Sequence, residues 1–244
     1  MYARIRCDDR HARRAVRGTG FPRRIVPPGD SNDRPQRVFR PMTETPSFLE
    51  DPTDTRDAIM RATYLALCKH GYADLTIQRI ADEFPKSKSL LYHHYDGKDD
   101  LLLDFLEFML EHQRERIPAE RMGSADEHLN AILDRVFSTP VSDDYRDFSR
   151  AMVELRAQAA HDDNYRDHFT RSDEFFRELL TDVIQSGIDD GVFHDVDAGQ
   201  VAASLLMTIT GAMTQRVTTT EETIPAVRDE LDAYIRRRLL ADGE

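Results

Sequence analysis

From residue 54 onward, apolar residues recur at the three- and four-residue spacing that gives a helix one apolar face. In the stretch 54–70, for example, Ile59, Ala62, Ala66 and Leu67 fall on one face. No segment of useful length alternates apolar and polar positions as a half-buried strand does. The pattern therefore predicts an all-α protein.

Start and stop signals divide this pattern into separate helices. Thr53 or Asp54 can cap the first helix, and Gly71 after it suits a left-handed residue. Pro85 cannot continue a helix, and we expect the fourth helix to stop before Pro118. The predicted helices are 54–70, 76–84, 87–94, 97–116, 125–138, 144–161, 165–189, 197–218 and 222–240.

Residues 1–41 differ from the rest of the chain. They hold 11 Arg, no Lys and 4 Asp, a net charge of +7, and show no helical or strand period. Such a segment, rich in Arg, Pro and Gly, is expected to be disordered. We favour a start-site error, with Met42 as the true initiator. A basic arm that reaches DNA and a solvated tail without a role are the alternatives.

The remaining chain carries a net charge of −19, within a total of −12. Asp outnumbers Glu by 30 to 15, and there are only four Lys. Hydrated carboxylates keep a protein soluble in concentrated salt, which also screens their mutual repulsion. This composition favours a salt-adapted cytoplasm, with an ordinary acidic protein as the alternative.

Several classes of protein are excluded or disfavoured. Cys7 and Cys68 cannot make a disulfide scaffold, and no apolar run reaches the roughly 18 residues of a membrane span. Nucleotide-binding, hydrolase and metalloprotease motifs are missing, and adjacent His93 and His94 point about 100° apart on a helix, which suits a shared metal poorly. We therefore predict a cytoplasmic protein that is not an enzyme and uses no cofactor or metal.

The first three helices have the proportions of a helix-turn-helix module, in which a short helix enters the DNA major groove. Such a module needs apolar residues between its second and third helices, which Ile80, Ala81 and Leu91 supply. It also needs a capping residue before the short helix, which Ser87 supplies, and donors that reach phosphates.

Residues 54–101 resemble the DNA-binding domain of TetR-family transcriptional regulators. The resemblance is carried, in order, by Gly71-Tyr72 with Thr76, Ile80-Ala81, Ser87-Lys88, Leu91-Tyr92, His94-Tyr95, and Lys98 with Leu101. It implies a three-helix DNA-binding domain, a linker helix, and a helical bundle that dimerises and binds a small molecule. The domains expected are 1–41, the disordered extension; 42–96, the DNA-binding domain; and 97–244, the ligand-binding and dimerisation domain.

The resemblance also implies roles for individual residues. Thr76 caps the second helix near a phosphate, Tyr92 packs and touches the backbone or a thymine, and Lys98 holds a phosphate. Positions facing the bases are Lys88, Ser89, Leu90 and His93. The full predicted DNA-binding set is Thr76, Lys86, Ser87, Lys88, Ser89, Leu90, Tyr92, His93 and Lys98.

Two features depart from the family pattern. Pro85-Lys86 stands where the family usually has Gly-Val, so the turn geometry must differ locally and the second helix is expected to end early. Residues 54–116 also carry a net charge of −3, whereas DNA-binding domains are usually basic. Three of the four lysines nevertheless cluster around the predicted reading helix: Lys86, Lys88 and Lys98.

The C-terminal half gives less specific signals. The nearly continuous apolar run Val201–Met213 indicates a core helix or a subunit interface, and the resemblance favours the interface. The candidate interface residues are Leu205, Ile209, Ala212, Leu231 and Ile235. Weak candidates for effector contact are Met152, Arg156 and Tyr165.

Together these features predict a homodimeric regulator that binds a palindromic double-stranded DNA operator. We expect a repressor that an unknown small-molecule effector releases, with the linker helix carrying the movement. The alternative is an acidic helical bundle that binds a small molecule or a protein, with a vestigial helix-turn-helix and no DNA binding. The poor net charge and Pro85 motivate that alternative.

Overall fold

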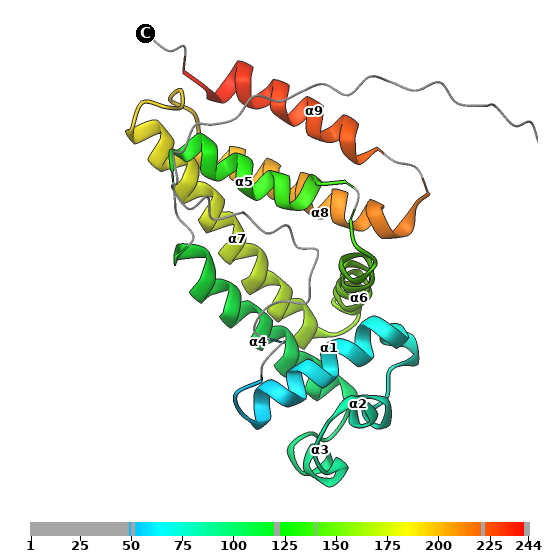
Figure 1. The fold of residues 1–244 in the computed structure, drawn as a ribbon. Helices are drawn as coiled ribbons and strands as arrows, with labels where there is room; N and C mark the ends of the chain where they lie inside the picture. Colours follow the sequence, from blue (N-terminus) through cyan, green and yellow to red (C-terminus); the bar gives the residue numbers. More distant parts are fainter. Residues whose placement is uncertain (1–48, 50–51, 120–122, 140, 221–222, 242–244) are drawn as a thin grey trace, which may run out of the picture. The chain divides into compact units, whose positions relative to one another are not determined.

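A computed structural model of the protein describes residue 49 and residues 52–119, 123–139, 141–220 and 223–241. Throughout these residues the regular structure is helical, apart from one isolated bridge between Phe193 and Leu240 (Figure 1). The all-α prediction is therefore confirmed. The expectations for residues 1–41 lie outside the described residues.

Every predicted helix is present, with bounds close to those expected. In chain order they are α1 (Thr55–Asp74), α2 (Ile77–Glu83), α3 (Lys88–His94), α4 (Lys98–Ala119), α5 (Ala125–Phe137), α6 (Asp143–Gln158), α7 (Asp163–Asp189), α8 (Ala198–Thr218), α9 (Ile224–Tyr234) and the π-helical turn η2 (Ile235–Leu239). Side-chain caps fix several starts, because Asp54, Thr76 and Asp197 each accept a hydrogen bond from a backbone N–H three residues ahead.

Two helix ends differ from the prediction. α4 continues to Ala119, past Pro118. Proline removes one backbone hydrogen bond, and the helix nevertheless includes Pro118. The last helix passes into η2, where the Leu240 N–H donates to the Ile235 carbonyl over 2.9 Å. Tertiary pairing explains that turn, because the His194 N–H donates to the Leu239 carbonyl over 2.7 Å.

The buried apolar side chains form two clusters. The first joins α1, α2, α3, α4 and α6 to the beginning of α7, and the second joins α5, α8, α9 and η2 to the rest of α7. The expected domain boundary at residues 96 and 97 falls inside the first cluster. The helix-turn-helix module is therefore packed through α1 on α4 and α6, as Figure 1 shows at the lower end of the molecule.

Candidate DNA-binding site

Helices α2 and α3 form the helix-turn-helix corner. The Thr76 hydroxyl accepts a hydrogen bond from the Arg79 N–H over 3.2 Å and so caps α2 as predicted. Ile80, Ala81 and Leu91 are buried between the helices. These apolar contacts hold α3 at a fixed angle to α2, which is what presents its outer face as one surface.

The turn between α2 and α3 shows how the chain accommodates Pro85. α2 ends at Glu83, and Phe84 takes an extended conformation with φ −85° and ψ 125°, as residues before proline prefer. Phe84 is buried and fills the corner, while Pro85 and Lys86 are exposed. Lys86 Nζ donates to Thr55 Oγ1 over 2.9 Å, at the start of α1.

Ser87 occupies the N-cap position of α3 as predicted, but its hydroxyl makes no capping hydrogen bond within the described chain. It lies 2.7 Å from the hydroxyl of Ser89 instead. Both hydroxyls stand on the exposed side of the corner, so they can exchange this contact for one with a phosphate or a base.

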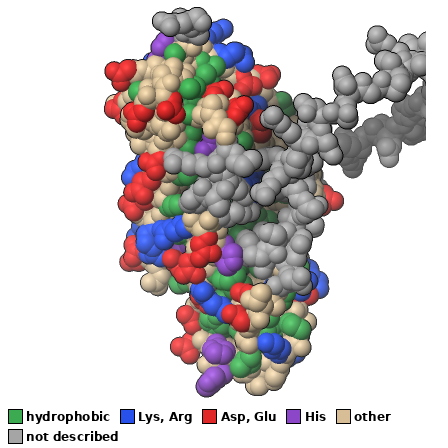
Figure 2. Space-filling model, turned by 60° about the vertical axis from the view of Figure 1, so that its left-hand side comes forward, with side chains coloured by type: hydrophobic (Ala, Val, Ile, Leu, Met, Phe, Trp, Pro, Cys, Tyr) green, Lys and Arg blue, Asp and Glu red, His purple; other side chains and the backbone are tan. Residues whose placement is uncertain are grey.

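Most of the predicted DNA-binding residues are exposed in or next to α2 and α3. Tyr92 is 55% exposed, an unusual exposure for a large apolar ring, and His93 beside it is also exposed. Histidine side chains are visible at the lower end of the molecule, where α3 lies (Figure 2). The predicted residues that the structure leaves exposed here are Thr76, Lys86, Ser87, Lys88, Ser89, Tyr92 and His93.

Leu90 and Lys98 differ from the other predicted contacts. Leu90 is half-buried and packs against the first core cluster, so only part of its side chain faces outward. Lys98 Nζ donates to the Tyr72 carbonyl over 3.1 Å and lies 4.0 Å from the centre of the Tyr72 ring. The ammonium group of Lys98 therefore already has partners inside the protein.

A polar network that the sequence did not reveal crosses the exposed face. Lys88 forms an ion pair with Asp82, and Gln78 Nε2 donates to the same Asp82 oxygen over 3.0 Å. The Tyr92 hydroxyl lies 3.4 Å from Gln78 Oε1, at the limit of a hydrogen bond. The hydrogen bond from Lys88, followed by the one from Gln78, lowers the pKa of Asp82. An ionised carboxylate thus orients the lysine at the start of α3.

Comparison with known proteins supports the identification of α2 and α3 as a helix-turn-helix. Residues 59–105 match the sequence profile of the bacterial regulatory proteins of the tetR family, and residues 125–240 match that of the BetI-type transcriptional repressor C-terminal domain. A TetR transcription regulator from Haloarcula marismortui is 42% identical in sequence, with a TM-score of 0.69 over 76% of this chain and 98% of that one. The protein belongs to the TetR family. It is a DNA-binding transcriptional regulator.

Two more distant relatives extend the comparison. The transcriptional repressor AcnR of Corynebacterium glutamicum is 23% identical over 195 residues, which cover 78% of this chain and 96% of that protein. A transcriptional regulator from Saccharomonospora viridis in complex with choline has the same fold. It is 23% identical, with a TM-score of 0.66 over 77% of this chain and 98% of that one.

The three candidate effector residues of this TetR-family chain all contact other side chains of the chain, and only Tyr165 is fully buried. Met152 packs against the first core cluster, and Arg156 pairs with Asp173 through two hydrogen bonds. Tyr165 is 1% exposed, and its hydroxyl donates to Asp99 over 3.0 Å.

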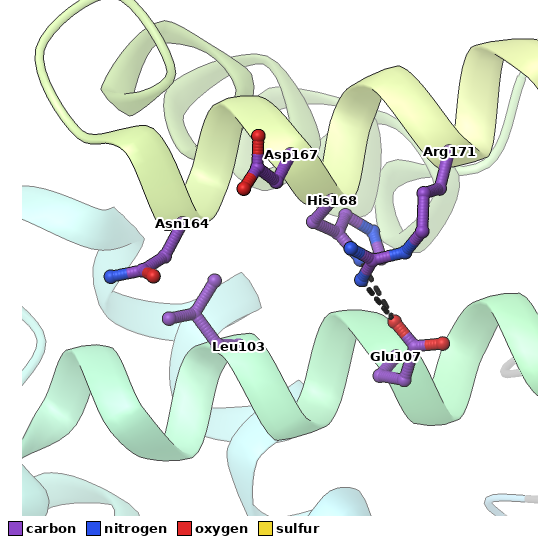
Figure 3. Close-up of a pocket in the computed structure, with 6 residues that line it drawn as sticks. All are labelled: Leu103, Glu107, Asn164, Asp167, His168 and Arg171. Atoms are coloured by element: carbon purple, nitrogen blue, oxygen red, sulfur yellow. Dashed lines mark hydrogen bonds and ion pairs between the residues drawn. The ribbon is translucent and has the colours of Figure 1, made fainter.

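A hollow of about 370 Å³ opens between α4 and α7, and none of the three candidates lines it (Figure 3). Glu107 Oε2 in its wall lies 2.9 Å from Arg171 and 3.4 Å from His168. Burial, opposed by Glu107, lowers the pKa of His168. The lining residues are Leu103, Glu107, Asn164, Asp167, His168 and Arg171.

The predicted subunit-interface residues lie mostly inside the chain. Leu205, Ala212 and Ile235 are buried in the second core cluster, which leaves them no surface for a partner, while Ile209 and Leu231 are half-buried. Helix α8 is apolar nearly all round, and the pattern alone did not separate its two sides. Its exposed side instead carries Ala203, Met207 and Gly211.

Among the described residues, no group of three or more His, Cys, Asp or Glu side chains is arranged to hold a metal ion. None of the helices described is long and apolar enough to cross a membrane.

Proposed function

We propose that this TetR-family regulator is a repressor that binds a near-palindromic operator as a homodimer. One exposed face with two lysines, two serine hydroxyls, a tyrosine and a histidine carries the proposal. It offers donors for phosphates and base edges on a helix short enough to enter the major groove. Repressor function is supported by the BetI-type profile and by AcnR.

The exposed side of α8 supports dimerisation. Met207 is 72% exposed, and Ala203 and Gly211 lie one turn before and after it on the same side. A Cβ atom built on Gly211 meets nothing within 4 Å, so nothing else in the described chain covers this position. A second copy that packs α8 against α8 would cover the three residues, which a monomer leaves in water.

The last part of the proposal is that a small-molecule effector releases the repressor from its operator. Release occurs if the effector binds more tightly to a conformation whose two reading helices no longer match the operator. The regulator from Saccharomonospora viridis supports a small-molecule site in this fold, since it was obtained with choline.

The test is a gel-shift assay on the DNA upstream of the protein's own gene, in potassium chloride, with wild type and the α3 variant Lys88→Ala/Tyr92→Ala. We expect wild type to shift the DNA. The variant should bind the DNA with an affinity at least about tenfold lower, since two contacts are removed. The matched control is Gln185→Ala/Ser186→Ala, on the exposed side of α7. Equal affinity of the α3 variant and wild type would contradict the proposed surface, and no shift at any salt would favour a bundle without DNA binding.

A further inference from the structure

Tyr72, at the corner between α1 and α2, is held by side chains from two other helices, and a third helix reaches it through Asp99. Its N–H donates to Glu154 Oε2 of α6 over 2.6 Å, and its carbonyl accepts a hydrogen bond from Lys98 of α4 over 3.1 Å. Its hydroxyl donates to Asp99 Oδ1 of α4 over 3.0 Å. The Tyr165 hydroxyl of α7 donates to the same Asp99 oxygen, also over 3.0 Å. We call these five residues the Tyr72 clamp.

The Asp99 carboxylate is the centre of the clamp. It stands in the first turn of α4, where a negative charge is favourable, and it receives two tyrosine hydroxyls from different parts of the chain. Burial, followed by the hydrogen bond to Asp99, raises the pKa of Tyr72 to about 12, so its hydroxyl remains a donor. Hydrogen bonds to an ionised acceptor are stronger and more directional than neutral ones.

Glu154 secures the other side of the same corner. Gly71 has φ +66°, and a Cβ atom on it would stand 3.0 Å from Glu154 Oε2. The carboxylate thus reaches the backbone at a point that only glycine leaves open. Through this contact α6 holds the end of α1, just before the module turns into α2.

We infer that Asp99, Glu154 and Tyr165 are positioning residues that fix the angle of the helix-turn-helix module on the C-terminal half. The apolar core beneath the module keeps it attached, but apolar packing is non-directional and tolerates small rotations. The clamp supplies directional bonds at the corner. In a dimer, a fixed angle of both modules fixes the separation of the two reading helices. The clamp therefore sets which spacing of operator half-sites is bound, an inference that rests on the proposed dimeric operator binding.

The test compares wild type, Tyr165→Phe and the control Tyr145→Phe on three operators, with native half-site spacing and with one or two added base pairs. Tyr165→Phe removes one hydroxyl from the clamp and keeps the buried ring. Tyr145 is also a buried tyrosine of the C-terminal half, and its ring lies 5.5 Å from Arg216, outside the clamp. Each added base pair rotates one half-site by about 35° relative to the other.

Wild type and Tyr145→Phe should prefer the native spacing strongly. For Tyr165→Phe, this preference should fall about tenfold, the effect of one lost hydrogen bond to a charged group. The slope of log affinity against log salt should stay unchanged, because no phosphate contact is removed. A preference equal to wild type, or equal weakening on all three operators, would overturn the inference.

A second measurement does not depend on any operator. Hydrogen exchange of the Tyr72 amide in the DNA-free protein should speed up in Glu154→Gln, which loses the charge of the acceptor, and in Tyr165→Phe. Unchanged exchange in both variants would overturn the clamp itself. If exchange responds as expected but wild type binds no palindromic DNA, the proposed function fails and the clamp stands as a structural link between the module and α6 and α7.

Discussion

Asp82 places a carboxylate on the same exposed face as Lys88 and Tyr92. Both partners of the Asp82–Lys88 ion pair are about half exposed, so the pair contributes little to the free energy of unfolding. We expect the ion pair to change the affinity for DNA instead. The carboxylate competes with phosphate for the ammonium group and repels the DNA backbone, and DNA must displace it to use Lys88 fully.

The substitution Asp82→Asn should therefore tighten operator binding by about threefold to tenfold, with the larger effect at low salt. Asp195→Asn, an exposed carboxylate between α7 and α8, is the matched control and should change little. Fluorescence anisotropy titrations at two potassium chloride concentrations measure both. Weaker binding by Asp82→Asn would mean that the carboxylate contacts a base, as an acceptor for cytosine does, and would contradict simple competition.

His168 gives the protein a pH-dependent stability. Burial, opposed by its contact with Glu107, lowers its pKa in the folded chain, so the folded state binds fewer protons than the unfolded state. Stability from this residue is present above the unfolded pKa of about 6.5 and is lost as the pH falls below it. The free energy of unfolding should decrease from pH 7.5 to 5.5, and less so in His168→Asn.

Urea titrations at the two pH values measure this difference, with His161→Asn as the exposed histidine control. An identical decrease in wild type and His168→Asn would show that other groups cause the acid sensitivity.

At the scale of the helices, the sequence predicted the number, order and approximate bounds of the elements, because apolar periodicity and capping residues are local signals. The π-helical end of the chain was missed, since it depends on pairing of Leu239 and Leu240 with the segment 192–194 far away in sequence. The resemblance to the family, carried by local residues, singled out side chains that the structure leaves exposed on α3, and their contact with DNA stays a prediction. The hydrogen-bond network through Gln78 and Asp82 was not predicted, although the spacing of four between these two residues already puts them on one helix face.

Gly71 is a helix-end signal in the sequence, and in the fold it also leaves room for the Glu154 carboxylate. Its φ of +66° alone makes alanine unfavourable by about 1–2 kcal/mol, and Glu154 must also give way to the new Cβ atom. Gly71→Ala should lower the free energy of unfolding by at least about 1 kcal/mol. Gly97→Ala is the matched control, because its Cβ would meet no described atom within 4 Å. Denaturant titration of the two variants checks this, and equal stability would contradict the strained corner.

The two sides of α8 could not be separated from the sequence, because both are apolar. If the proposed dimer forms through this exposed side, Met207→Glu should convert it to a monomer, since a charge would be buried in the interface without a partner. Sedimentation velocity measures this, with Ser186→Glu on the exposed side of α7 as the charge control. A variant that remains dimeric would place the interface elsewhere.

For the whole molecule, the acidic charge and the DNA-binding function need not conflict. Outside residues 1–41 the chain carries a net charge of −19, yet Lys86 and Lys88 stand together on the exposed corner. Screening by salt reduces the repulsion of DNA by distant carboxylates more than it reduces contacts made within a few ångströms. We therefore expect specific binding to persist in concentrated potassium chloride, and a salt-adapted origin remains a prediction from composition.

Hydroxyl-radical footprinting of the DNA upstream of the protein's own gene, in potassium chloride, tests the central claim most directly. A dimer that places one α3 in each of two major grooves should protect two half-sites of a near-palindrome about one helical turn, or a multiple of it, apart. Lys88→Ala/Tyr92→Ala should abolish this protection. A single protected half-site, or the same footprint with the α3 variant, would contradict it.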